Sequence, residues 1–155
     1  MKNFSFTFEV RADLPAVWNF YTDLRHLDVI TPKALRLRVV RSSCGHAMVE
    51  GADVWLDARP MIFHLRWHTK ITLLRPYRYE DEMISGPFKT WKHIHDFRTV
   101  EPGVTLVADS GLFELPYGPL GGLFEGYAYS TISKIFQARK QATISALETG
   151  NPLEG

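Results

Sequence analysis

Two histidines and an aspartate have the spacing that points most directly to chemistry. His93 and His95 lie two positions apart in Trp-Lys-His-Ile-His-Asp-Phe, residues 91–97. Aromatic and histidine side chains alternate there with a second set that includes the charged Lys92 and Asp96. In a β-strand this alternation places both histidines on one face. A turn at residues 101–103 would pair this strand with the following one and set His95 directly opposite Asp109.

An aspartate inside a sheet is costly unless it is paired, and His95 is the available partner for Asp109. The pair would serve as a structural contact, as a hydrogen-bonding end of a ligand pocket, or as a general acid and base in enolisation or dehydration. A metal held by His93, His95 and Asp109 is a fourth use. No third histidine follows, and Asp109 is the only acid that the pattern places inward. We therefore predict no metal and no cofactor.

The composition limits the partners of this chain of 155 residues. Ten Phe, six Tyr and four Trp indicate an interior rich in rings, and a net charge of +1 offers no excess field for nucleic acid. No apolar stretch reaches the roughly 20 residues that cross a bilayer. The single cysteine, Cys44, cannot close a disulfide within the chain. We expect a cytoplasmic protein with no nucleic-acid partner and no integral membrane segment.

Changes in the spacing at which apolar residues recur predict the helices and strands that position these residues. Alternation over residues 4–10 predicts a strand, and the residues after it predict a short helix over 13–23 and a second over 24–29. Strands dominate from residue 34 to 115, separated by turns that favour an antiparallel meander. A helix of about 25 residues then carries the apolar stripe Leu123, Phe124, Tyr127, Ala128, Thr131, Ile135, Ala138, Ala142 and Ala146.

These elements predict an α+β fold, because each has one apolar face to bury. A curved antiparallel sheet around the long C-terminal helix, with two short helices after the first strand, buries all of them. We predict a single domain over residues 1–148 and a flexible tail over 149–155.

A turn at residues 59–61 predicts a second hairpin. The expected pairs on its core face are Ala58 with Phe63, Leu56 with Leu65 and Val54 with Trp67. On the outer face we expect Asp57 beside His64, Trp55 beside Arg66, and both His64 and His68 solvated. An exposed Trp55 is compatible with a weak dimer contact.

Several motifs together resemble the START-like ligand-binding superfamily, most closely its cyclase/dehydrase-like (polyketide cyclase-like) SRPBCC proteins. They are Gly86-Pro87-Phe88, Trp91-x-His93-x-His95-x-Phe97, Gly103-Val104-Thr105, Asp109, Pro116-x-Gly118 and Ile135-Phe136-x-x-Arg139. The resemblance covers essentially the whole chain. It implies a helix-grip (START-like, Bet v 1-like) fold with a deep hydrophobic cavity between sheet and C-terminal helix. Superfamily members bind lipids, sterols, plant hormones, quinones or polyketide intermediates, and a few catalyse cyclisation, but no catalytic residue is carried over.

We therefore expect this chain to bind a small hydrophobic, ring-containing or lipid-like molecule as a monomer or weak homodimer. The alternative is a cyclase or dehydratase that uses His95 and Asp109 on a polyketide-like substrate. Tyr117, in the rigid connection after Pro116, would form a rim over the ligand. The predicted cavity lining is Trp67, Trp91, His93, His95, Phe97, Asp109, Phe113, Tyr117, Tyr127 and Ile135.

Overall fold

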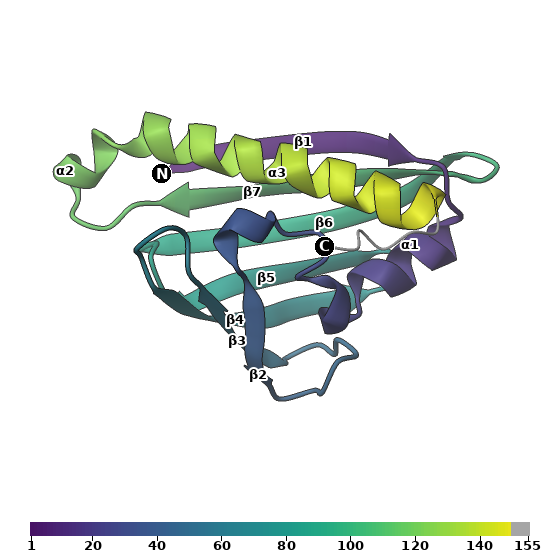
Figure 1. The fold of residues 1–155 in the computed structure, drawn as a ribbon, viewed down its shortest axis with the longest axis horizontal. Helices are drawn as coiled ribbons and strands as arrows, with labels where there is room; N and C mark the ends of the chain where they lie inside the picture. The colour runs from purple at the N-terminus through teal and green to yellow at the C-terminus, as the bar shows by residue number, and fades with distance from the viewer. Residues whose placement is uncertain (150–155) are drawn as a thin grey trace.

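Residues 1–149, which the computed structural model describes, form a seven-stranded antiparallel sheet with one long helix across it (Figure 1). The strands are β1 (Lys2–Val10), β2 (Arg38–Ser42), β3 (Asp53–Ala58), β4 (Leu65–Arg75), β5 (Arg78–Ser85), β6 (Thr90–Glu101) and β7 (Val104–Glu114). Their order across the sheet is β1-β7-β6-β5-β4-β3-β2. The predicted tail over 149–155 lies outside the described residues, apart from Thr149.

The helices lie along one face and at the ends of the sheet. The long helix α3 (Glu125–Glu148) runs along β1, and α1 (Leu14–Tyr21) covers the far ends of the central strands (Figure 1). The short α2 (Pro119–Gly122) precedes α3, and the 3₁₀ turns η1 (Leu24–His26) and η2 (Lys33–Leu35) follow α1. This arrangement confirms the predicted helix-grip fold. None of the helices in residues 1–149 combines the length and apolar character needed to cross a bilayer.

The segment between α1 and β2 is less regular than predicted. The expected helix over 24–29 is only the turn η1, where the Asp23 carboxylate accepts a hydrogen bond from the Arg25 N–H. The strand expected from residue 34 begins at Arg38 instead. The turn η2 and the positive φ of Arg36 (47°) interrupt the extended backbone there, although the apolar alternation starts earlier.

The hairpin of β6 and β7 has the predicted register. The observed pairs are Trp91 with Phe113, His93 with Gly111, His95 with Asp109 and Phe97 with Val107. His93, His95 and Phe97 are buried, whereas Lys92 before them and Arg98 after them are exposed. The tight turn with Gly103 at a φ of 74° fixes this register, because the next strand can then begin at only one position.

The hairpin of β3 and β4 is shifted by two residues from the prediction. The observed pairs are Ala58 with Leu65, Leu56 with Trp67 and Val54 with Thr69. The connection is longer than expected because Met61 has a positive φ of 52° and the Phe63 N–H donates to the Pro60 carbonyl. Phe63, the predicted partner of Ala58, is therefore 62% exposed. An even shift leaves the side chains that are paired in both registers on their predicted faces.

The inner face of α3 is rotated by about one residue from the predicted stripe. The buried residues of the helix are Ile132, Phe136, Ala142 and Thr143. Leu123 and Phe124, which helped to set the predicted phase, precede the helix and are exposed. Polar Thr143 occupies the inner face, so the apolar pattern alone gave the wrong phase.

Among residues 1–149, the buried apolar side chains form three clusters. The first comprises Phe8, Val10, Val17, Tyr21, Ile30, Tyr79, Phe97 and Val107. The second comprises Phe4, Phe113, Ile132 and Phe136, and the third comprises Leu24, Val54 and Leu56. Buried polar side chains of β4 to β7, described below, lie on the sheet between them.

Gly111 allows the strands and the Phe4 ring to approach closely. An added Cβ would lie 2.1 Å from the Lys92 carbonyl oxygen and 2.8 Å from Phe4 Cζ. We expect Gly111→Ala to lower the free energy of unfolding by about 1–3 kcal/mol, measured by urea denaturation. The control Gly126→Ala, at an open position of α3, should raise it by about 1 kcal/mol. An unchanged stability of Gly111→Ala would contradict the described packing.

Candidate functional site

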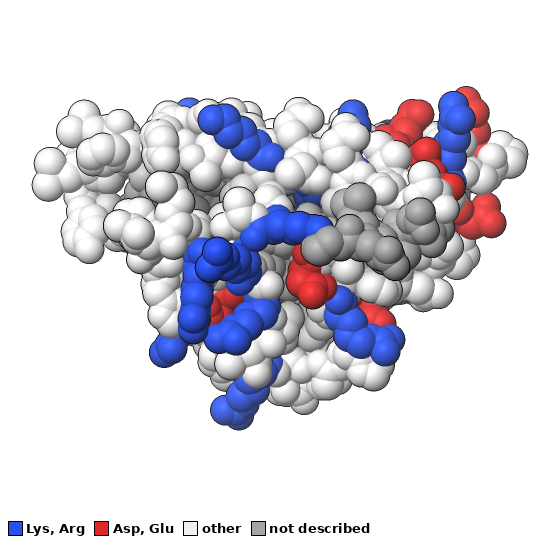
Figure 2. Space-filling model, viewed as in Figure 1, with Lys and Arg blue, Asp and Glu red and all other residues white. Residues whose placement is uncertain are grey.

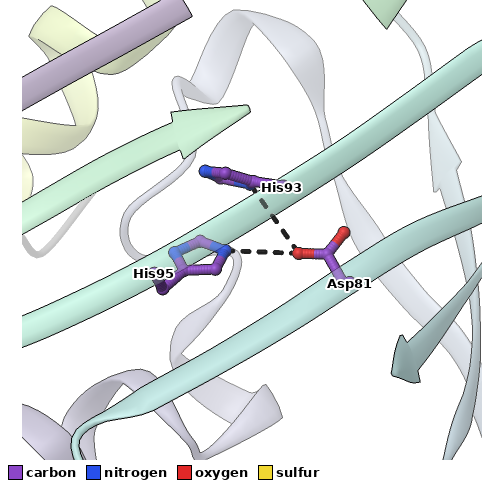
Figure 3. A group of neighbouring side chains, drawn as sticks. All are labelled: Asp81, His93 and His95. Carbon is purple, nitrogen blue, oxygen red and sulfur yellow. Dashed lines mark hydrogen bonds and ion pairs between the residues drawn. The ribbon is translucent and has the colours of Figure 1, made fainter. Parts of the chain in front are cut away.

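Two histidines and two aspartates form one cluster on the inner face of the sheet; Figure 3 shows three of its members. His93 and His95 come from β6, Asp109 from β7 and Asp81 from β5. His93 Nε2 donates a hydrogen bond of 3.1 Å to Asp109 Oδ1. The same oxygen lies 2.7 Å from His95 Nδ1, although out of line for a regular hydrogen bond. The predicted contact between His95 and Asp109 is thus present, and His93 joins it.

Asp81 is the member that the sequence patterns missed. His95 Nε2 donates to its Oδ2 at 3.2 Å, and His93 Nδ1 lies 3.7 Å from the same oxygen. Thr69 Oγ1 donates to the other carboxylate oxygen at 3.2 Å. The charged stretch at residues 78–82 looks solvated, but a period of two from the buried Tyr79 would have placed Asp81 inward. The expectation of a single inward acid is therefore wrong.

Burial and charge act in opposite directions on the two histidines. Their side chains are 6% and 3% exposed. Burial and the charge of His95 lower the pKa of His93 below its ordinary value. Burial alone would also lower the pKa of His95, but the charge and short contact of Asp109 and the hydrogen bond to Asp81 raise it instead.

Both carboxylates of the cluster are held in their ionised form. Burial would raise the pKa of Asp109, but the charge of His95, the hydrogen bond from His93 and the short His95 Nδ1 contact keep it far below its ordinary value. Burial opposes ionisation of Asp81 as well, but the hydrogen bond from His95, the charges of both histidines and the hydrogen bond from Thr69 together outweigh it, so the pKa of Asp81 is also lowered. The cluster therefore brings two negative charges into a mostly apolar interior.

Aromatic rings surround the two imidazoles. The Tyr79 ring stacks on His95 with centroids 4.0 Å apart. Phe4, Trp91 and Phe136 present edges or faces to His93 at centroid distances of 5.5, 5.8 and 5.4 Å. The histidine–aspartate cluster thus lies between the first and second apolar clusters, with aromatic rings on both sides of it.

Further buried polar groups come from α1 and α3. Tyr21 Oη and Thr143 Oγ1 share a hydrogen bond of 2.8 Å. The Arg139 guanidinium lies 5.5 Å from the centre of the Phe136 ring, and its Nε is buried with no hydrogen-bond partner among the described residues. Burial raises the pKa of Tyr21 and the pKa of Tyr79, and the positive charge of Arg139 partly offsets this increase. Sequence reasoning gave none of these groups a role.

The predicted cavity lining is only partly brought together. Phe97 and Phe113 are buried on the face that carries the cluster, and Trp67 and Trp91 are half-buried. Tyr117 and Tyr127 are 82% and 76% exposed, so neither contributes to this interior. The rotation of α3 accounts for Tyr127, and it also leaves the predicted Ile135 only half-buried.

A hollow of about 420 Å³ opens beside η1 and β2. Its apolar residues are Leu24, Leu27, Leu37 and Val39, and Arg25, Asp28, Arg38 and His46 complete it. A neighbouring hollow of about 370 Å³ includes Lys33 and Arg36 and shares Leu37 and Asp28 with the first. Figure 2 shows Lys and Arg side chains gathered on this part of the surface. The apolar residues of the first hollow belong to the third apolar cluster or pack against it, as Trp67 also does.

The outer face of the sheet carries two histidine–aspartate pairs of similar length. His68 Nε2 contacts Asp53 at 2.7 Å, and His64 Nε2 contacts Asp57 at 2.8 Å. Both histidines face outward as predicted, with side chains 21% and 40% exposed. Trp55 stacks on His68, not on Arg66 as predicted, because of the shifted register. These pairs match the inner contact in distance, and both histidines are more exposed than His95, although the Asp57 carboxylate is itself buried.

A curved antiparallel sheet that holds a C-terminal helix, with polar groups buried between them, defines a helix-grip domain of the START and Bet v 1-like class. The model of the family described as polyketide cyclase / dehydrase and lipid transport matches residues 10–136, so this chain belongs to that family. The finding confirms the predicted relationship. No curated protein sequence matches the chain.

Solved structures of low sequence identity share the fold. A protein of Thermus thermophilus is 17% identical, with a TM-score of 0.76 over 97% of this chain and 99% of that chain. A START superfamily protein from Mycobacterium smegmatis is 14% identical, with a TM-score of 0.72 over 96% and 99%. Norcoclaurine synthase from Thalictrum flavum, solved with dopamine and hydroxybenzaldehyde, is 16% identical, with a TM-score of 0.72 over 97% and 88%.

Proposed function

We propose that this domain binds a small apolar molecule, ring-containing or lipid-like, between the sheet and α3, with one polar end at the histidine–aspartate cluster. The observation that carries the proposal is the burial of His93, His95 and Asp109 among aromatic rings. A buried ion pair adds less stability than apolar residues of the same volume. A use in recognition explains its presence better than a use in packing.

The groups around the cluster support a ligand with a carbonyl, hydroxyl or acidic oxygen. The buried Arg139 Nε is a donor without a partner among residues 1–149, and the ring wall of Phe4, Trp91 and Phe136 suits a flat or aliphatic body. We propose the hollow beside η1 as the entrance, where its basic rim suits an acidic group of the ligand. The family description, which includes lipid transport, agrees with such a ligand.

A thermal-shift screen tests this function. On protein stripped of metal with EDTA, we expect one class among quinones, fatty acids, sterols and flavonoids to raise Tm saturably. At 100 times Kd the stabilisation is about 2.7 kcal/mol, or roughly 5–10 °C for a chain of this length. Arg139→Gln should weaken that binding about tenfold, whereas the exposed Tyr127→Ala should leave it unchanged. A screen in which no class raises Tm would contradict the proposal.

A second candidate, a cyclase or dehydratase, is favoured by the 2.7 Å contact of Asp109 with His95 beside the ring wall. His95 would exchange protons with a polyketide-like substrate while Asp109 orients the ring. His95→Gln should then stop the formation of an aromatic product from a poly-β-keto substrate, followed by chromatography, and leave binding intact. Unaltered turnover would reject this role for His95.

We also propose that the domain works in the cytoplasm as a monomer or weak homodimer. The free Cys44 and the balanced charge support this setting. Sedimentation equilibrium at micromolar concentration should give the mass of one chain, and a stable higher oligomer would contradict it.

A further inference from the structure

Three ligand-type atoms converge where β5 faces β6 (Figure 3). Asp81 Oδ2 lies 3.2 Å from His95 Nε2 and 3.7 Å from His93 Nδ1, and the ligand atoms of the three residues lie within 4.8 Å of one another. Two ligands that each lie about 2.1 Å from a shared tetrahedral ion are about 3.4 Å apart. The two measured separations bracket that value.

We propose that Asp81, His93 and His95 bind a divalent transition-metal ion of the zinc or iron type. Two imidazoles and one carboxylate, with further positions left open, are a donor set that these ions use at catalytic sites. The prediction of no metal rested on the lack of a third ligand after His93 and His95. Asp81, which that prediction overlooked, supplies it from the neighbouring strand.

Asp109 orients both rings for this role. His93 Nε2 donates to Asp109 Oδ1, and His95 Nδ1 lies 2.7 Å from the same oxygen. An ion would displace the Nε2 proton that His95 otherwise donates to Asp81. With the remaining ring protons on the Asp109 side, both rings then direct a lone pair to the Asp81 side. Carboxylates that hold metal-binding histidines in this way are the usual outer shell of such sites. Thr69, which donates to Asp81 Oδ1, fixes the carboxylate ligand in the same manner.

Charge and access also fit a divalent ion. Asp81 and Asp109 contribute two carboxylates to a buried cluster, and a divalent cation makes the group neutral, which reduces the cost of burial. The Asp81 side chain is 17% exposed, compared with 3% for His95. The open coordination positions therefore lie toward Asp81, where water or a ligand oxygen can reach the ion.

This site does not depend on the proposed apolar ligand, whose screen uses protein without metal. An ion there would add a Lewis acid that polarises a carbonyl oxygen of the bound molecule. It excludes the acid–base role of His95, because a ring nitrogen that binds an ion cannot carry a proton.

Cobalt binding tests the site. Full-length protein, freed of tags and metal, is titrated with Co²⁺ and followed by visible d–d absorption, with Zn²⁺ as competitor. We expect one equivalent to bind, Asp81→Asn and His93→Gln each to weaken binding at least ~100-fold, and Asp109→Asn to weaken it about 10–100-fold. The control His68→Gln removes the outward pair with Asp53 and should leave the titration unchanged.

Two outcomes of the titration overturn the proposal. One is the absence of a saturable d–d band in the folded wild type, and the other is loss of the band in His68→Gln but not in Asp81→Asn. Wild-type NMR gives a readout that needs no variant to fold. Co²⁺ should shift and broaden the ring signals of His93 and His95 before those of His64 and His68, and the reverse order rejects the site. Failure of the metal site in the titration or in the NMR experiment leaves the Tm screen with apolar compounds unaffected. The metal-site proposal and the ligand-binding proposal are therefore tested independently.

Discussion

Asp109→Ala is expected to lower the free energy of unfolding by about 3–5 kcal/mol, the loss typical when one partner of a buried ion pair is removed. The Asp109 side chain is 1% exposed and lies next to both His93 and His95. Without it, His95 keeps one of its two carboxylate partners, Asp81, and must either hold its charge with less compensation or lose its proton, and both options destabilise the folded chain. Urea denaturation of metal-free protein, followed by circular dichroism, measures the difference.

The matched control is Asp53→Ala on the outer face of the same sheet. Asp53 contacts His68 at 2.7 Å, the distance between Asp109 and His95, but its side chain is 27% exposed. Water replaces the lost contact there, so stability should hardly change. Equal losses for the two variants would mean that burial of the inner cluster has no energetic role, contrary to our description of the site.

Phe136→Ala is expected to cost about 3–5 kcal/mol, as truncation of a buried phenylalanine generally does. The residue is 7% exposed, its ring stacks on Phe6 with centroids 4.7 Å apart, and its edge or face contacts Phe4 and His93. Truncation leaves a hole between α3 and β1 and removes one wall of the cluster. Thermal and urea unfolding give the loss.

Tyr127→Ala is the control for Phe136, because the predicted stripe and the observed helix phase assign these two rings opposite environments. Tyr127 is 76% exposed, so its truncation should change stability by no more than about 0.5 kcal/mol. A large loss for Tyr127→Ala with a small one for Phe136→Ala would restore the predicted phase and contradict the described one.

The part of the site that sequence predicts well is the hairpin of β6 and β7. A short glycine turn and strict alternation leave one register, so the pairing of His95 with Asp109 follows from local rules. The predicted pairing of β3 with β4 was wrong by two residues. The length of the turn depends on the backbone conformation at Met61, which composition does not reveal. The prediction of which side chains face the core still held for the paired residues, since side-chain direction depends only on whether the shift is odd or even.

Asp81 and Arg139 were missed for a different reason. Both are charged residues on an inner face, and hydrophobic patterns assign such residues to solvent. The burial of Asp81 on β5 depends on a partner from another strand, His95 of β6, and the Arg139 guanidinium lies against the Phe136 ring of its own helix. The functional groups of this interior are therefore the positions where patterns of polarity fail.

The central claim, a ligand site beside the buried cluster, is tested most directly by NMR of the histidine rings. The compound class that raises Tm in the screen is added to ¹⁵N-histidine-labelled protein without metal. We predict saturable shifts of the His93 and His95 ring signals, while His64 and His68 on the outer face stay unchanged. Shifts confined to His64 and His68, or none at saturation, would place the ligand elsewhere and contradict the account.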